Sequence, residues 1–292
     1  MDLKIKNIIN ITAFLVCIGL INIAGQNIEI EIRGMNAFTF ILIVAVLLQI
    51  IFFIPSFILK TEKYYDLVGS LTYIATVSLA YFSVENRTMI DSIIYFYVMI
   101  WASRLGMYLF TRVRNVGKDV RFEKAKRHFF WFLQYWMGQA LWVSLTACSA
   151  IIAILSPEDD TLPVLAIVGM ALWLSGFTIE SISDYQKRVF RKENNPNETF
   201  IHTGLWARSR HPNYFGEITL WTGIAVIALN TLTGIEYITL VSPVFVYILL
   251  TRMSGVNLLE RIADERYGHL EEYQRYKRIT PVLIPNLFKN KT

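Results

Sequence analysis

The chain has 292 residues, of which 54% are hydrophobic, 14% aromatic and only 17% charged. Long apolar runs at this composition are typical of a polytopic membrane protein. The formal net charge of +5 comes without an RNA or DNA motif, so we exclude a nucleic-acid partner and expect the basic residues in cytoplasmic loops.

Several segments of the chain are apolar and close to the ~20 residues that a helix needs to cross the hydrocarbon core. They are residues 8–24, 37–59, 66–84, 90–111, 130–155, 162–182, 213–230 and 236–252. The first follows Lys4 and Lys6, but no small-residue cleavage site comes after it, which favours a retained helix over a signal peptide. We predict an all-α transmembrane bundle of about seven to eight spans, with residues 1–292 as a single integral membrane domain.

The loops between these spans alternate in charge. Basic side chains gather in residues 60–65, 112–128 and 185–211 and in the tail after Arg252, whereas the intervening loops are short and mainly acidic. Because basic loops stay on the cytoplasmic side of a membrane, we expect both termini there.

The tail 255–279 is highly charged, yet it keeps apolar residues at roughly helical spacing, namely Leu258, Leu259, Ile262 and Tyr267. This pattern predicts an amphipathic helical segment on the inner membrane surface. Gly268 is expected to break it into two pieces.

A polar stretch from Asp184 to Gly223 stands out in the apolar chain. Pro212 favours the first helical position, because proline has a fixed φ and no N–H. His211 then precedes the free N–H groups of that helix, where the positive end of the helix dipole favours an anion such as phosphate. One face is shared by residues at three- and four-residue spacings, which are Arg210, Tyr214, Glu217 and Trp221.

Two other spans carry polar stripes at membrane depth, where a charge costs roughly 2.5–3.5 kcal/mol. The stripes are Tyr97, Trp101, Arg104 and Tyr108 in the span 90–111, and Asp66, Ser70 and Tyr73 in the span 66–84. Arg104 can instead extend to the membrane interface, and Asp66 can cap its helix, so a purely structural role stays open for both.

Asp184, the segment from Arg210 to Glu217, and Glu260 all fall at cytoplasmic span ends in this topology. Charges of both signs suit a ligand with anionic and hydrogen-bonding groups, such as a dinucleotide or S-adenosylmethionine. The sequence has no GxGxxG or P-loop signature and no HExxH or Cys/His cluster, so we expect no soluble cofactor fold and no metal. Cys17 and Cys148 lie in apolar runs and are expected to be free thiols.

These motifs resemble a known family. They are Asp184-Tyr185 with Arg191, Gly204-Leu205-Trp206, Arg210-His211-Pro212-Asn213-Tyr214-x-Gly216-Glu217, and the tail residues Glu260, Tyr267-Gly268, Tyr273, Tyr276 and Ile284-Pro285. With Trp101 to Arg104 and Lys118-Asp119-x-Arg121-Phe122, they resemble the bacterial DUF1295 proteins of the steroid 5-alpha-reductase superfamily over about residues 60–288.

The resemblance implies a reductase of the bacterial inner membrane that binds NADPH at the cytoplasmic helix ends. It implies hydride transfer to a C=C bond of a hydrophobic, steroid- or lipid-like substrate. The residues that match cofactor contacts of steroid reductases are Asp184, Arg191, Asn213, Glu217 and Tyr267, with Arg104 close by. From their chemistry and position we add Arg210, His211, Tyr214 and Glu260, because an Arg can hold phosphate by forked hydrogen bonds.

The chain departs from the steroid reductases at the pair that polarises the substrate carbonyl. Those enzymes use a glutamate on the second span and a tyrosine on the fourth. Aligning Phe53-Ile54-Pro55-Ser56-Phe57 with them puts Phe53, or a near neighbour, at the glutamate position and Trp101 at the tyrosine position. A 3-keto steroid is therefore not the expected substrate. The catalytic candidates are Tyr97, Trp101, Tyr108 and Asp66, with Tyr73 as a further proton donor to consider.

Two other functions stay open. Isoprenylcysteine carboxyl methyltransferases have a similar Arg-His-Pro-x-Tyr-x-Gly stretch and a similar tail, yet they bind S-adenosylmethionine. Asn213, Glu217 and the pair of Asp184 with Arg191 favour the reductase, and basic residues suit phosphates better than a cationic sulfonium. The third hypothesis is a lipid-binding membrane protein without enzymatic activity.

Overall fold

The computed structural model describes residues 3–116, 122–156, 162–194, 198–253 and 255–286. The described residues form helices, joined by loops and one short hairpin. Contacts divide the chain into two compact units, one of Met1–Ala166 with Ala225–Ser242 and one of Ile167–Ile224 with Pro243–Thr292. The single membrane domain stays a prediction.

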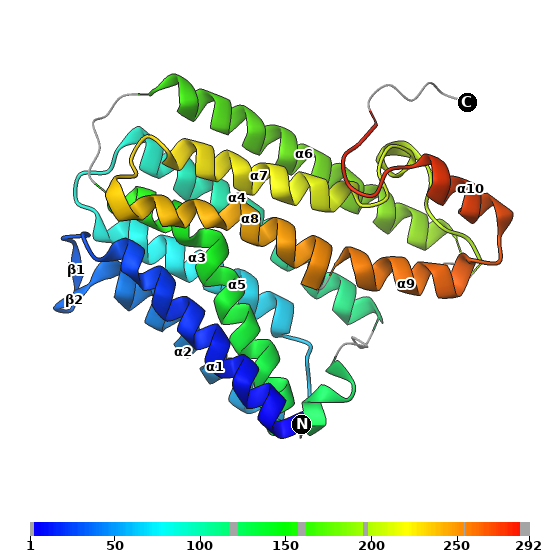
Figure 1. Cartoon of the computed structure of the whole chain (residues 1–292), viewed down its shortest axis with the longest axis horizontal. Helices are drawn as coiled ribbons and strands as arrows, with labels where there is room; N and C mark the ends of the chain where they lie inside the picture. Colours follow the sequence, from blue (N-terminus) through cyan, green and yellow to red (C-terminus); the bar gives the residue numbers. More distant parts are fainter. Residues whose placement is uncertain (1–2, 117–121, 157–161, 195–197, 254, 287–292) are drawn as a thin grey trace. The chain divides into compact units, whose positions relative to one another are not determined.

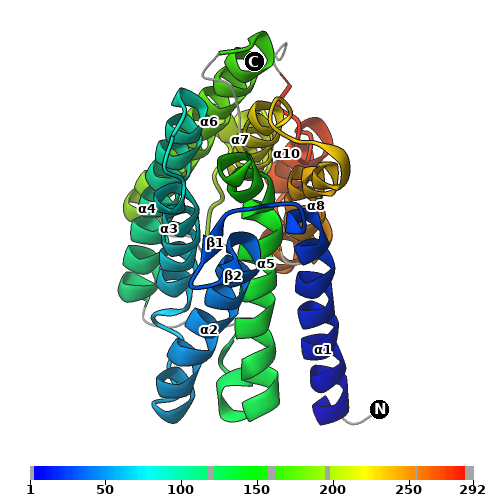
Figure 2. The same cartoon turned by 90° about the vertical axis from the view of Figure 1, so that its left-hand side faces the viewer.

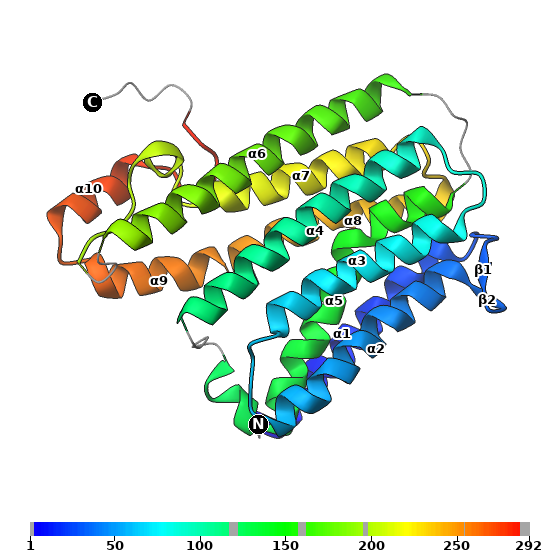
Figure 3. The same cartoon turned by 180° about the vertical axis from the view of Figure 1, so that it is seen from behind.

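The first unit is built around α5 (Phe129–Leu155). Helices α1 (Leu3–Ile21), α2 (Ala37–Ile58) and α3 (Tyr65–Ser83) pack against α5, as Figure 2 shows for α1 and α2. Helix α4 (Met89–Val116) runs beside α3 (Figure 3). All residues of α5 from Thr146 to Leu155 are buried, and the small side chains among them let neighbouring helices approach closely.

The first unit also contains several short elements between its long helices. Between α1 and α2 lie the 3-10 turn η1 (Asn22–Gly25) and the antiparallel strands β1 (Glu31–Ile32) and β2 (Met35–Asn36). The Asn36 side chain caps α2, because its Oδ1 accepts from the Thr39 N–H at 3.1 Å while its amide donates to the Gly25 carbonyl at 2.9 Å. Two further 3-10 turns are η3 (Ala125–Arg127) and η5 (Gly234–Leu240).

The second unit holds most of α6 (Val164–Glu193) and α7 (Pro212–Ala228), the turn η4 (Gly204–Ala207), and the C-terminal helices. These are α8 (Val241–Ile248), the π-helical segment η6 (Leu249–Met253), α9 (Val256–Tyr267) and α10 (Glu271–Ile279) (Figure 1). Helix α7 begins at Pro212, and α9 and α10 are separate helices on either side of Gly268. Both sequence predictions are confirmed.

Glycines bring α6 and α7 into backbone contact. A Cβ atom on Gly176 would lie 2.6 Å from the Gly216 carbonyl oxygen, and one on Gly216 would lie 2.6 Å from the Gly176 carbonyl oxygen. A Cβ on Gly223 would also meet the Gly169 carbonyl at 2.6 Å. Only glycine permits such an approach, which is a common way for membrane helices to associate.

Six helices among the described residues are long and apolar enough to cross a membrane. They are Leu3–Gly25, Ala37–Ile58, Met89–Arg112, Phe129–Leu155, Val164–Glu193 and Gly234–Tyr267. The predicted spans 66–84 and 213–230 are also helical, as α3 and α7, but α7 has only 17 residues and α3 carries many hydroxyl side chains. An all-α polytopic membrane protein is confirmed. Cys17 and Cys148 are free thiols, as expected.

The glycine contact yields a stability prediction. Gly216→Ala places a methyl group against the α6 backbone, so we expect an overpacking cost of roughly 1–3 kcal/mol in the free energy of unfolding. Gly19→Ala is the control, because no atom lies within 4 Å of its added Cβ. Thermal unfolding in detergent, followed by circular dichroism, should show a lower midpoint for Gly216→Ala alone. Equal midpoints for the two variants would contradict the contact.

Candidate functional site

A cavity of about 180 Å³ lies in the second unit, among the C-terminal part of α6, the loop before α7, α9 and α10. Its lining combines cations and aromatic rings. The cations are Lys187, Arg191, Arg210 and Arg266, and the rings besides His211 are Phe190, Phe200, Trp206, Tyr267, Tyr273 and Tyr276. Glu260 is the carboxylate of this lining.

Helix α6 supplies Lys187, Phe190 and Arg191 at three- and four-residue spacings, which puts them on one face. The Lys187 ammonium lies 4.5 Å from the ring centroid of Trp206, a cation–π contact. The Trp206 indole N–H donates to the Ser183 carbonyl at 3.1 Å. Trp206 thus holds the turn η4 against α6 at the cavity.

Aromatic rings from α9 and α10 pack around Phe200. Its ring centroid lies 5.1 Å from that of Tyr273, 5.3 Å from Tyr276 and 5.7 Å from Tyr267. The Tyr276 hydroxyl donates to the Trp206 carbonyl at 2.7 Å, and the Tyr273 hydroxyl donates to Asp264 at 3.0 Å. Burial raises the pKa of both tyrosines above the usual value, so these hydroxyls stay protonated hydrogen-bond donors.

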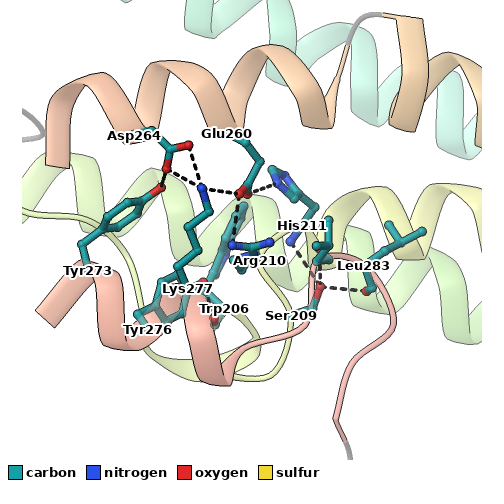
Figure 4. Close-up of polar contacts among 11 residues, drawn as sticks. Trp206, Ser209, Arg210, His211, Glu260, Asp264, Tyr273, Tyr276, Lys277 and Leu283 are labelled. Carbon is teal, nitrogen blue, oxygen red and sulfur yellow. Dashed lines mark hydrogen bonds and ion pairs between the residues drawn. The ribbon is translucent and has the colours of Figure 1, made fainter. Parts of the chain in front are cut away.

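Glu260 of α9 is the centre of an ionic cluster (Figure 4). Its Oε1 lies 2.8 Å from His211 Nε2, and its Oε2 lies 3.1 Å from Arg210 Nη1 and 3.8 Å from Lys277 Nζ. Lys277 also binds Asp264 at 2.6 Å. Arg210 Nε is buried without a hydrogen-bond acceptor among the described residues, so this guanidinium keeps a donor for a ligand.

His211 is buried at the start of α7. Burial lowers the pKa of its imidazole below the usual value, although the hydrogen bond to Glu260 opposes this shift. The ring stacks on Tyr214, with centroids 5.6 Å apart and an interplanar angle of 11°. At neutral pH His211 is therefore an uncharged ring whose Nε2–H can donate to Glu260.

The predicted cofactor residues of this unit fall into two groups. Those that line the cavity are Arg191, Arg210, His211, Glu260 and Tyr267, and Tyr214 stacks on His211. The second group lies at the α6–α7 contact, where the Asn213 side-chain amide donates to Asp184 at 3.4 Å. Asp184 and the nearby Glu217 of α7 are both buried.

The remaining candidates lie in the first unit. Tyr97, Arg104 and Tyr108 are half-buried on α4. Trp101 is buried and contacts Tyr73 edge to face, with ring centroids 5.0 Å apart. Asp66 forms an ion pair with Arg112 at 3.6 Å.

Phe53 is only 2% exposed and packs in an aromatic cluster with Tyr65, Phe122, Phe132 and Trp136. An apolar core therefore occupies the place where the resemblance puts a glutamate. Of the motif in the loop after α4, Phe122 belongs to this core, whereas Lys118, Asp119 and Arg121 lie outside the described residues.

Sequence reasoning missed part of the cavity lining, namely Lys187, Phe190, Phe200, Trp206, Arg266, Tyr273 and Tyr276 as site residues. Helical spacing before Arg191 is a signal that could have found Lys187 and Phe190. Phe200 lies in a loop and Trp206 in the short turn η4, where no longer periodicity marks them. Among the described residues, no group of three or more His, Cys, Asp or Glu could hold a metal ion.

Fold and site together define a polytopic α-helical membrane protein with a basic, aromatic cavity in its second unit. The chain belongs to the family described as "Protein of unknown function (DUF1295)", whose model matches residues 52–280. It is also similar to 3-oxo-5-alpha-steroid 4-dehydrogenase 1 of Macaca fascicularis, with 27% identity over 122 residues, or 42% of this chain and 41% of the relative. The Mus musculus protein of that name is 31% identical over 121 residues, or 41% of this chain and 42% of the relative.

These matches span less than half of the relatives' length. No solved structure matches the chain. The chain is thus a membrane protein of this family that is similar, over part of its length, to the enzymes named above.

The burial of His211 yields a pH prediction. Because the pKa of His211 is lower in the folded chain, the unfolded chain binds more protons below about pH 6.5, so the free energy of unfolding falls as the pH drops below that value. The midpoint of thermal unfolding should decrease between pH 7.5 and 5.5, and less so in His211→Gln. His269→Gln is the control, because His269 is exposed and should leave the wild-type dependence intact. Parallel curves for wild type and His211→Gln would contradict this role of His211.

Proposed function

We propose that the chain is a membrane-embedded reductase that binds NADPH and transfers hydride to a C=C bond of a hydrophobic, steroid- or lipid-like substrate. The observation that supports this proposal is the cavity lined by four cations and several aromatic rings. Guanidinium groups match phosphate oxygens by forked hydrogen bonds, and aromatic rings offer stacking surfaces for a base. The residues present therefore fit a phosphorylated dinucleotide.

Charge distinguishes NADPH from S-adenosylmethionine at this cavity. Lys187, Arg191, Arg210 and Arg266 face a single lining carboxylate, Glu260, which is already shared by His211, Arg210 and Lys277. The positive excess attracts the phosphate charges of NADPH and repels a cationic sulfonium. This balance favours the reductase over the methyltransferase.

The size of the cavity suggests which part of the dinucleotide it binds. Its volume of about 180 Å³ is below the roughly 300–1,000 Å³ of pockets for drug-sized ligands. We assign to it the phosphate-bearing end of NADPH, held by Arg191 and Arg210. Asp184, Asn213 and Glu217 are proposed to bind ribose hydroxyls or the carboxamide, because carboxylates accept hydrogen bonds and Asn both donates and accepts.

Reduction of a C=C bond needs a hydride and a proton. NADPH supplies the hydride when bound, and a side chain of the protein must supply the proton. Tyr97, Tyr108 and Tyr73 stay the proposed proton donors, with Asp66 assisting them. Trp101, the remaining catalytic candidate, contacts Tyr73 edge to face. Since Phe53 lies in an apolar core, no carboxylate at that position can polarise a conjugated ketone, which argues for a substrate other than a 3-keto steroid.

Titration of the purified protein tests the cofactor. NADPH should bind and S-adenosylmethionine should not, as measured by calorimetry in detergent. Arg191→Ala should weaken NADPH binding by about tenfold or more, because it removes charge-assisted hydrogen bonds worth about 1.5–3 kcal/mol. Arg188→Ala is the matched control, since Arg188 stands on the same helix and faces the Tyr185 ring at 5.5 Å instead of the cavity.

The outcomes separate the three hypotheses. Binding of S-adenosylmethionine alone would favour the methyltransferase. Binding of neither ligand would favour a lipid-binding protein without enzymatic activity. Equal NADPH affinity in Arg191→Ala and wild type would remove Arg191 from the proposed site.

We also propose that the cavity faces the cytoplasm, because Lys187, Arg191 and Lys192 belong to a basic segment. In a Cys17→Ser background, a membrane-impermeant maleimide should label Glu85→Cys in intact cells. It should label Lys192→Cys only after permeabilisation. Both positions are exposed in the structure. The reverse pattern would contradict this orientation.

A further inference from the structure

Residues 280–286, the C-terminal strap, run along the loop of residues 208–211 that precedes α7. The Arg210 N–H donates to the Pro281 carbonyl at 2.9 Å, and the His211 N–H donates to the Val282 carbonyl at 3.1 Å. The Asn286 N–H in turn donates to the Arg208 carbonyl at 2.9 Å. The two segments are therefore paired through their main chains.

The buried side chain of Ser209 adds hydrogen bonds to this main-chain pairing. Ser209 is fully buried, and its hydroxyl donates to the Leu283 carbonyl at 2.7 Å while it accepts from the His211 N–H at 3.2 Å (Figure 4). The same oxygen lies 3.4 Å from the Val282 carbonyl. Ser209 thus contacts both the strap and the backbone of His211, a member of the ionic cluster around Glu260.

The backbone held in this way carries the polar side chains of the cavity. Arg210 and His211 follow Ser209 directly, and both bind Glu260. An arginine side chain has many rotamers, so the placement of its guanidinium depends on where its backbone is held. The loop is irregular, and outside a helix only such contacts can hold it.

We propose that Ser209, together with the strap, is a positioning element that holds Arg210 in the cavity for the phosphate-bearing end of the cofactor. This inference rests on the proposed function. The strap begins at residue 280, where the family-matched region ends. Ser209 touches no ligand in this proposal and acts through the backbone of Arg210.

The first test is NADPH affinity. Ser209→Ala should weaken NADPH binding by about fivefold, the change that corresponds to one net hydrogen bond of about 1 kcal/mol. Ser183→Ala is the matched control, because Ser183 is equally buried in this unit and its hydroxyl bonds within α6, to the Ile179 carbonyl at 2.6 Å. Ser183→Ala should bind NADPH as wild type does. Equal affinity in Ser209→Ala and wild type would overturn the proposal.

A double-mutant cycle separates positioning from general stability. If Ser209 acts through Arg210, Ser209→Ala should change NADPH affinity by less than twofold in an Arg210→Ala background. A role in folding alone predicts the same fivefold loss in both backgrounds, and that additivity would overturn the proposal.

Amide hydrogen exchange tests the strap without cofactor. Peptides that cover residues 280–286 should exchange at least fivefold faster in Ser209→Ala than in Ser183→Ala or wild type, because local opening of the strap becomes easier. Unchanged exchange would overturn the proposal that Ser209 holds the strap, whether or not NADPH binds. Failure of wild type to bind NADPH would reject the proposed function separately. Should Ser209→Ala not fold, Ser209→Cys replaces it, since a thiol is a weak donor of similar size.

Discussion

The site depends on how one carboxylate is shared. Glu260 lies within ion-pair distance of Arg210, His211 and Lys277, which come from the loop before α7 and from α10. A half-buried cluster of this kind contributes little net stability, yet loss of one partner leaves an uncompensated charge. Glu260 therefore fixes where the loop, α9 and α10 meet. The positive excess of the cavity comes from its other lining cations, Lys187, Arg191 and Arg266.

Helix packing explains how such a cluster is compatible with an otherwise apolar chain. Membrane helices gain little from hydrophobic association, so α6 and α7 meet through glycines that bring their backbones together. Gly216 precedes Glu217 and follows Asn213 by one turn, and the Asn213 side-chain amide donates to Asp184 of α6 at 3.4 Å. The glycine contact between α6 and α7 therefore lies within one turn of a polar contact between the same two helices.

The sequence predicted the elements well where a local physical rule determines them. Pro212 begins α7 because of proline geometry, and the break at Gly268 follows from glycine between two charged helices. Spacing also grouped Arg210 with the start of α7. It could not find Phe200, Trp206 or the strap, because their positions depend on contacts between residues far apart in the chain, such as Tyr276 with Trp206. The sequence prediction also counted α3 and α7 as spans, together with the six helices that are long and apolar enough to cross a membrane.

The contrast between the proposed cofactor residues and the proposed substrate residues bears on the substrate of the proposed reductase. Several of the predicted cofactor residues line a basic cavity, which fits the proposed NADPH site. The resemblance puts the acid that would activate a conjugated ketone at or near Phe53, whose ring stacks with Phe57 at 5.7 Å and meets Phe129 edge to face at 5.2 Å. Restoring a glutamate there would bury a charge among aromatic rings at a cost of several kcal/mol. The core around Phe53 is thus suited to packing, which supports a substrate that is activated by other groups than those of a 3-keto steroid reductase.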